Sequence, residues 1–167
     1  MKISKNFGKH DLCIETGKIA KQANGSVVVS YGETTLLATV VCSKEASDNR
    51  SFFPLSVEYR EKFYAAGRIP GGFFKREARP SEHEIIASRL TDRPIRPLFP
   101  SDFFHETQVL INVLSYDGSI NPDILGTIGA SAALSISDIP WDGPVASVRI
   151  GRVDGQFIIN PTKEDLE

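Results

Sequence analysis

The pattern of apolar and polar positions in the first third of the chain is typical of β-strands. Residues 18–23 and 26–31 flank an Asn-Gly pair, a strong hairpin signal because both central residues of a type I′ turn need a positive φ. A second turn at Gly32-Glu33 leads into residues 34–42, where continuous Thr, Leu and Val indicate a strand buried on both faces. The pattern therefore predicts a sheet-rich N-terminal part.

Capping residues mark a first helix. Ser81-Glu82-His83-Glu84 has the form of a capping box, in which the serine and the last glutamate each satisfy a backbone N–H at the start of a helix. We expect the helix to end just before Pro94, at Arg93, because a proline disfavours the α conformation in the residue before it. The three prolines of residues 94–100 predict an extended run.

A second helix is predicted from Asn121-Pro122-Asp123, which offers an N-cap, a proline at the first position and an acid in the first turn. Its expected buried stripe recurs every four residues and comprises Ile124, Ile128, Ala132 and Ile136. Another side has almost no bulk, which predicts close packing; it comprises Gly126, Gly129, Ala130 and Ala133.

Further strands are predicted at residues 54–59 and 107–116, and a hairpin at residues 145–152 and 156–159 around an Asp-Gly turn. Strands and helices thus alternate along the chain. This alternation favours an α+β or α/β sandwich in which helices pack on a sheet.

Composition places the chain among globular proteins. Its 167 residues fit one domain, and 41% hydrophobic with 24% charged residues exclude a disordered chain. The net charge of −2 excludes a basic protein that coats nucleic acid, although not a local basic patch. Cys13 and Cys42 lack the spacing of a zinc site, so we expect both to be reduced. Without an apolar leader or a run of about 20 apolar residues, we expect a soluble, cytoplasmic protein outside membranes.

Charge is segregated along the sequence. Residues 60–100 hold nine Lys and Arg against five Asp and Glu, a local net charge of +4 that leaves −6 for the rest of the chain. Phe73-Phe74-Lys75-Arg76 lies here, in a predicted loop that begins with Gly-Gly. It suits single-stranded nucleic acid, because bases stack on rings while cations meet phosphates. The alternative is that both rings fill a subunit interface.

The first predicted helix carries charge among its apolar residues. Its apolar side comprises Ile85, Ile86 and Leu90. Arg89 and Arg93 project between these residues on a helical wheel. Because an isolated buried ion is costly, we expect Arg89 to pair with a carboxylate inside the fold. For Arg93, and for Arg96 beyond the helix end, a structural pair and contact with RNA are both open.

Catalytic signatures do not stand out. Gly126-Thr127-Ile128-Gly129 lies in a helix pattern and lacks the Lys-Ser/Thr ending of a phosphate loop. The three histidines are scattered without metal-ligand spacing, and no Ser/His/Asp arrangement is evident. We therefore predict neither a catalytic nor a metal-binding residue in this chain.

A strong resemblance to bacterial polynucleotide phosphorylase lies in the run from Gly71 to Pro100, GGFFKREARPSEHEIIASRLTDRPIRPLFP. The match looks like the first ribonuclease-PH-type domain and spans essentially the whole chain. It implies an α+β ribonuclease-PH-type β-α-β sandwich with helices on a mixed sheet. Residues 1–167 would be this first domain, truncated at the C-terminus, with a second PH domain and KH and S1-type domains outside the chain.

The resemblance implies a 3′-to-5′ phosphorolytic exoribonuclease that degrades single-stranded RNA (mRNA) to nucleoside diphosphates. Inorganic phosphate is the co-substrate, Mg²⁺ and the catalytic residues lie outside this chain, and three chains form a homotrimeric ring with no DNA expected. RNA binding carries over onto Phe73, Phe74, Lys75, Arg76, Arg79, Arg93 and Arg96. Two departures from the family are Lys75 in place of arginine, which loses the planar fork, and Ala78 in place of glycine.

Two alternatives to this interpretation are open. One is a ribonuclease-PH-type enzyme, a single-domain phosphorolytic nuclease that trims tRNA 3′ ends, although the basic segment favours polynucleotide phosphorylase. The other is a non-catalytic RNA-binding or ring-scaffold subunit. In each case we expect the chain to be inactive by itself.

Overall fold

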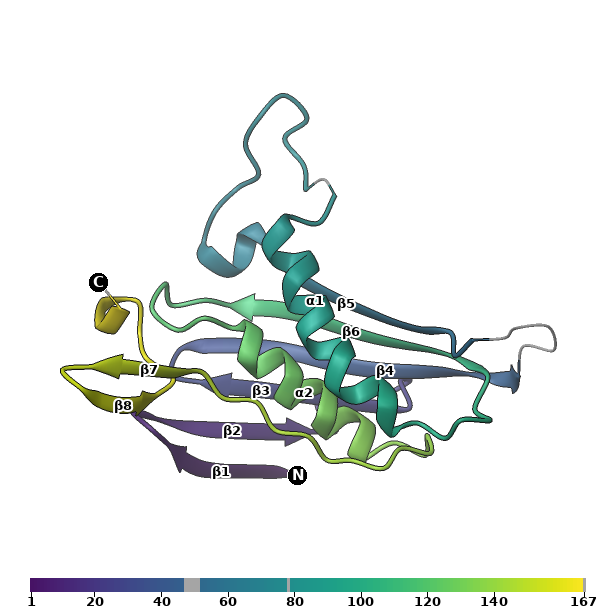
Figure 1. The fold of residues 1–167 in the computed structure, drawn as a ribbon. Coiled ribbons are helices and arrows are strands. Elements are labelled where there is room, and N and C mark those ends of the chain that lie inside the picture. Colours follow the sequence, from purple (N-terminus) through teal and green to yellow (C-terminus); the bar gives the residue numbers. More distant parts are fainter. Residues whose placement is uncertain (47–51, 78, 167) are drawn as a thin grey trace.

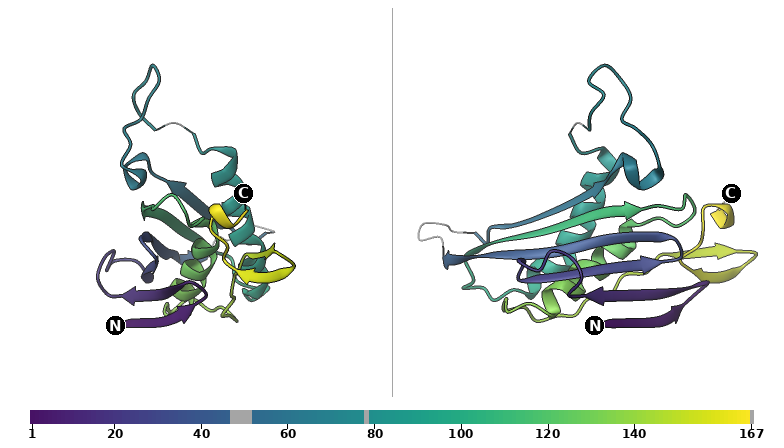
Figure 2. Two further views of the ribbon diagram at one scale, coloured as in Figure 1. Left: turned by 90° about the vertical axis from the view of Figure 1, so that its left-hand side faces the viewer. Right: turned by 180° about the vertical axis from the view of Figure 1, so that it is seen from behind.

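A six-stranded mixed sheet, covered on one face by two helices, forms most of the computed structural model, which describes residues 1–46, 52–77 and 79–166 (Figure 1). The view from behind shows the opposite face of this sheet without a helix over it (Figure 2). A two-stranded sheet lies beside the C-terminal end. The arrangement confirms the predicted α+β fold with helices packed on a mixed sheet.

The large sheet contains both sequence-adjacent and distant strands. Its strands are β1 (Lys2–Phe7), β2 (His10–Thr16), β3 (Gly25–Tyr31), β4 (Thr34–Ala46), β5 (Leu55–Glu61) and β6 (His105–Ser115). Their order is β1-β2-β3-β4-β6-β5, and neighbours are antiparallel except β5 and β6, which run parallel. The strands predicted around residues 34–42, 54–59 and 107–116 are confirmed.

The helix-facing side of β4 forms the centre of the core. Leu36, Ala38 and Val40 are fully buried there, opposite fully buried residues of β6. The alternate residues Thr35 and Leu37 point to the other face and are half-buried. The strand is therefore fully covered on one side, rather than on both as predicted.

The hairpin predicted at Asn24-Gly25 is wrong. Residues 17–24 connect β2 to β3 without forming a strand, and Gly25 is the first residue of β3. A Cβ atom on Gly25 would collide with the backbone carbonyl of Ala133. Glycine is thus needed here for close approach of a helix, and not for the positive φ of a turn.

The first helix, α1 (Glu82–Ile95), begins with the predicted capping box. Ser81 Oγ accepts the Glu84 N–H at 3.2 Å, and Glu84 Oε2 accepts the Ser81 N–H at 2.6 Å. Glu82 and Glu84 also place two acids in the first turn, where the helix dipole favours negative charge.

The C-terminal end of α1 differs from the prediction. The helix passes through Pro94 and continues into a 3₁₀ turn, η2 (Arg96–Leu98), so neither the stop near Arg93 nor the extended run is correct. Tertiary contacts hold this segment helical, since the Trp141 indole N–H donates to the carbonyl of Ile95 at 3.0 Å.

The face that α1 buries was also predicted wrongly. The predicted apolar side is exposed: Ile85 to 46%, Ile86 to 57% and Leu90 to 57%. The buried residues are instead Glu84, Ala87, Thr91 and Ile95. Arg89 is exposed, so the expected internal ion pair of this side chain is wrong. The small, polar side of α1 allows close helix contact, with the hydroxyls of Thr91 and Thr127 only 3.0 Å apart.

The second helix, α2 (Asp123–Ser135), packs on the sheet through small residues and carries Asp123 in its first turn, as predicted. Its N-cap is Pro122, so the prediction of Asn121 as the N-cap with the proline at the first helical position is wrong. A Cβ atom on Gly129 would lie 2.9 Å from Ala38 Cβ and 3.1 Å from Leu36 Cδ1. The stripe predicted at every fourth residue is wrong beyond its first member. Burial falls along it from buried Ile124 through half-buried Ile128 and Ala132 to exposed Ile136.

The second sheet consists of β7 (Ile150–Val153) and β8 (Gln156–Ile159). The predicted Asp154-Gly155 turn is confirmed, with φ of 48° and 83° at its two residues. The first strand begins at Ile150, later than predicted. The residues before it are held against α2 by the ion pair of Arg149 and Asp123, at 2.6 Å.

Candidate RNA-binding site

A long loop joins the 3₁₀ turn η1 (Phe63–Ala66) to α1 and projects away from the sheet in all views (Figure 1, Figure 2). Its described residues, 67–77 and 79–81, contain neither helix nor strand. Gly72 takes a left-handed φ of 75° at its bend, a conformation that glycine adopts without steric cost. The predicted Gly-Gly-led loop is confirmed.

Two phenylalanine rings lie at the outer part of this loop. Phe73 is 93% exposed and Phe74 is 71% exposed. Their ring centroids are 5.4 Å apart in an edge-to-face arrangement. Large apolar side chains with this exposure offer stacking surfaces to a ligand, since the described residues place no other ring against them.

The loop that carries the two rings also carries three basic residues after them in the sequence. The Arg76 guanidinium lies 5.6 Å from the centroid of the Phe74 ring, and Lys75 and Arg79 are exposed. Lys75 has a φ of 47°, a left-handed conformation that costs a residue with a Cβ atom about 1–2 kcal/mol. The expectation for Ala78 concerns a residue outside the described part of the loop.

The two arginines near the end of α1 do not join this cluster. The helix has 14 residues, so its two ends are about 20 Å apart, and the loop lies at the N-terminal end. Arg93 is exposed at the other end. Arg96 donates to both carboxylate oxygens of Asp92, at 2.6 and 3.0 Å, and to the carbonyls of Phe53 and Leu55. Its guanidinium is therefore hydrogen-bonded to groups of the domain itself.

A buried carboxylate fixes the base of the loop. Glu84 Oε1 accepts the backbone N–H of Glu61 at 2.9 Å and lies 3.9 Å from Arg60 Nε. Burial alone would raise the pKa of Glu84, but the N–H groups of Ser81 and Glu61 and the nearby Arg60 lower it below its ordinary 4.5. The internal ion pair expected of α1 is therefore made by Glu84 and not by Arg89.

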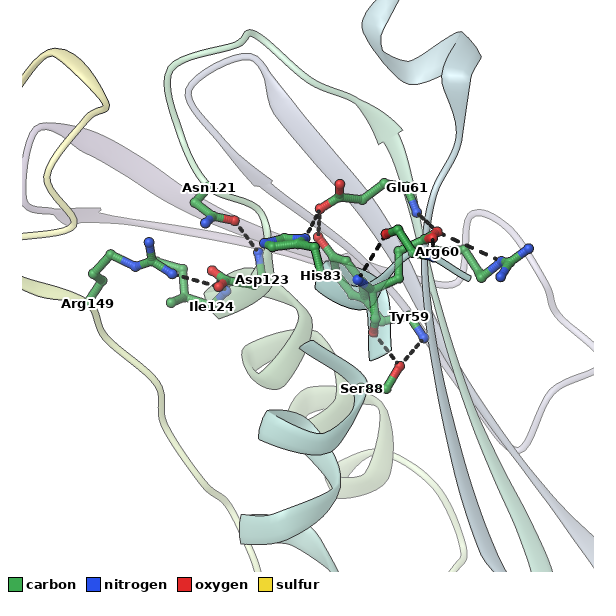
Figure 3. A network of polar contacts seen from close by, with 11 residues as sticks. Tyr59, Arg60, Glu61, His83, Ser88, Asn121, Asp123, Ile124 and Arg149 are labelled. Carbon is green, nitrogen blue, oxygen red and sulfur yellow. Dashed lines mark hydrogen bonds and ion pairs between the residues drawn. The ribbon is translucent and has the colours of Figure 1, made fainter. Parts of the chain in front are cut away.

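Glu61 extends this network toward the solvent. It accepts the Tyr59 hydroxyl at 2.8 Å and lies 3.3 Å from His83 Nδ1 (Figure 3). Burial, together with the charge of Glu61, raises the pKa of Tyr59 far above its ordinary value, so the phenol stays a hydrogen-bond donor. These contacts join the end of β5 to the start of α1, and so give the loop between these two elements a rigid base.

Sequence reasoning missed a pocket of 390 Å³ at the foot of the loop. It is lined by Glu61, Lys62, Phe63, Ala65, Ala66, Arg68, His83, Val113, Tyr116, Asn121, Pro122 and Lys163. These residues come from five separate segments with no shared motif, so only the fold brings them together.

The described part of the chain lacks two further kinds of feature, metal-ligand clusters and membrane-spanning helices. Among the described residues, no group of three or more His, Cys, Asp or Glu side chains is placed to hold a metal ion. No helix formed by these residues is both long and apolar enough to cross a membrane.

Comparison with known proteins identifies the family of this chain. Residues 9–140 match the 3′ exoribonuclease family, domain 1, and residues 143–167 match domain 2 of that family. The polyribonucleotide nucleotidyltransferase of Geotalea uraniireducens is 57% identical over 166 residues, which are 99% of this chain and 24% of that protein. That of Thermomicrobium roseum is 61% identical over 155 residues, 93% of this chain and 20% of that protein. The chain spans about a quarter of the length of such relatives, and they confirm the resemblance to polynucleotide phosphorylase.

Solved structures show the same fold at low sequence identity. Rice Rrp46 superposes with a TM-score of 0.69 at 18% identity, covering 96% of this chain and 72% of that one. The Archaeoglobus fulgidus exosome with RNA bound to its active site gives a TM-score of 0.62 at 19% identity, covering 92% and 67%. With the family match over most of its residues, the chain belongs to the 3′ exoribonuclease family.

Proposed function

We propose that the chain is the first ribonuclease-PH-type domain of a longer 3′-to-5′ phosphorolytic exoribonuclease, and that this domain binds the RNA. The observation that carries the proposal is the exposed pair Phe73 and Phe74 with Arg76 beside it. The name shared by the relatives, polyribonucleotide nucleotidyltransferase, supports it over a tRNA-trimming enzyme. The substrate would be single-stranded RNA such as mRNA.

The loop would hold RNA without reading its sequence. Stacking of a base on an aromatic ring contributes about 1–3 kcal/mol and tolerates every base, as a processive exonuclease requires. Lys75, Arg76 and Arg79 would contact phosphates. Arg93 would contact RNA only if the RNA strand extends along α1. We assign Arg96 a structural role, through its hydrogen bonds within the domain.

The remaining machinery would lie elsewhere in the protein. We infer a homotrimeric ring in the cytoplasm, in which three copies of the loop form a constriction around one RNA strand. Phosphate would attack the 3′-terminal linkage at a site outside this chain. We also propose that Mg²⁺ supports the reaction and is bound by parts of the protein outside this chain.

The test uses the full-length protein with Phe73→Ala and Phe74→Ala together. We expect weaker binding of poly(A), by about tenfold or more, with the trimer and the melting temperature unchanged. Phe157→Ala is the matched control, since this ring is 78% exposed but lies on β8. A double variant that dissociates into monomers, yet binds RNA normally per assembled ring, would instead identify the two rings as an interface contact.

A further inference from the structure

The pocket at the foot of the loop combines an apolar wall with a cationic rim. Phe63, Val113, Tyr116 and Pro122 supply the wall. The rim carries three cations, Lys62, Arg68 and Lys163, against one lining acid, Glu61, which lies beside His83. Concave sites with apolar walls and a few convergent polar groups are the usual form of small-molecule sites.

Two of the rim cations are available to a ligand. Lys62 is bound by Glu77 and His83 lies against Glu61. In contrast, no ion pair within the described residues engages Arg68 or Lys163, and both side chains are exposed at the pocket mouth. An anion would meet these two charges first.

Tyr116 gives the pocket an aromatic surface held in place. Its hydroxyl donates to the carbonyl of Gly118 at 3.2 Å, its backbone N–H donates to Ala65 at 2.9 Å, and it is half-buried. Lys163 Nζ lies 5.2 Å from the ring centroid. A planar ligand against this ring would therefore have its anionic group within reach of Lys163.

We propose that this pocket binds one nucleotide, with the base against Tyr116 and Phe63 and the phosphate on Arg68 and Lys163. The volume of 390 Å³ is near the lower end of ligand pockets, about 300–1,000 Å³, which suits one nucleotide and not an oligonucleotide. The same chemistry serves a free nucleoside diphosphate or one nucleotide of an RNA chain. The site is separate from the loop rings, since none of its lining residues is Phe73 or Phe74.

Photo-crosslinking of the full-length protein tests the proposal. One arm uses 8-azido-ADP, and the other uses a short RNA that contains 4-thiouridine. Peptides are then mapped by mass spectrometry. We expect labelling of peptides that contain Phe63 or Tyr116, and the arm that labels them identifies the source of the nucleotide. If neither arm labels these peptides at saturating probe, the proposal is wrong.

Variants identify the groups responsible. Arg68→Ala with Lys163→Ala should reduce the pocket label by about tenfold or more, because each removes a charge-assisted phosphate contact. Tyr116→Phe should keep the label, since it retains the ring. Lys21→Ala is the matched control, an exposed lysine in the turn before β3. Unchanged labelling in the Arg68/Lys163 variant would overturn the proposal.

The outcome is distinguishable from that for the loop. Phe73→Ala with Phe74→Ala should leave the pocket label with 8-azido-ADP unchanged. Loss of that label in the loop variant, with the fold intact, would show that the nucleotide rests on the loop rings and not in the pocket.

Discussion

The carboxylate of Glu77 accepts a hydrogen bond of 2.7 Å from Lys62 Nζ, and so joins the returning arm of the loop to the residue that precedes η1. The same side chain accepts the backbone N–H of Phe63 at 3.0 Å. The Lys62 ammonium and this N–H lower the pKa of Glu77 below its ordinary 4.5. Because Lys62 also lines the pocket, this contact connects the aromatic loop with the pocket at its foot.

Replacing Glu77 by Gln should loosen the loop without unfolding the domain. Glutamine keeps the shape but weakens both charge-assisted contacts. We expect trypsin to cut after Lys75 and Arg76 several times faster in the variant at neutral pH, at an unchanged melting temperature. Equal cleavage rates would mean that the contact does not restrain the loop.

Glu84 should contribute a pH-dependent part of the stability. Its pKa in the folded state lies below 4.5, so its contribution is present above the unfolded-state pKa and is lost as the pH falls through the folded-state value. Glu84→Gln should lower the free energy of unfolding by about 1–3 kcal/mol near pH 7. Urea unfolding at pH 7 and at pH 3.5 checks this, and we expect the difference between the two proteins to shrink at the lower pH. A constant difference would exclude the ionised carboxylate as its source.

Gly129 should not tolerate a methyl group. The added Cβ would be 2.9 Å from Ala38 Cβ, an atom that can move away only if the backbone of β4 moves with it. Gly129→Ala should therefore destabilise the domain by about 1–3 kcal/mol despite the better helix propensity of alanine. Gly71→Ala is the control, because nothing lies within 4 Å of the Cβ position there. Equal urea midpoints for the two variants would contradict the packing argument.

Local signals were readable in the sequence, whereas the choice of buried faces was not. The capping box of α1 and the Asp154-Gly155 turn depend on neighbouring residues, and both are present. The buried side of α1 depends on how closely α2 and β5 approach, which favours Thr91 over the larger Leu90. Gly25 illustrates the same limit, since its partner Ala133 is more than a hundred residues away in the sequence. The loop motif was readable because its rings and cations are neighbours in the sequence, whereas the pocket is assembled from distant segments.

Arg89 and Arg96 should differ in their effect on stability. Arg89 is exposed, so Arg89→Ala should change the free energy of unfolding by no more than about 0.5 kcal/mol. Arg96→Ala removes the hydrogen bonds to Asp92 and to the carbonyl of Leu55, which should cost about 1–2 kcal/mol. Thermal unfolding of both variants is the measurement. The reverse order would show that α1 buries the side predicted from the helical wheel.

The salt dependence of RNA binding should separate the cations of the loop from its rings. Each phosphate contact to a single strand contributes about 0.7 to the slope of log K against log salt concentration, because a bound cation releases a counterion. In the full-length protein, Lys75→Ala with Arg76→Ala should reduce the magnitude of this slope by about 1.4 per loop engaged. Phe73→Ala with Phe74→Ala should weaken binding at every salt concentration and leave the slope unchanged, since stacking releases no counterions. Titrations of poly(A) at 50, 100 and 200 mM salt, roughly the range over which such slopes are resolved, provide the comparison. If the cation variant keeps the original slope, the phosphates are held elsewhere, and Arg93, the exposed cation near the far end of α1, becomes the next position to test.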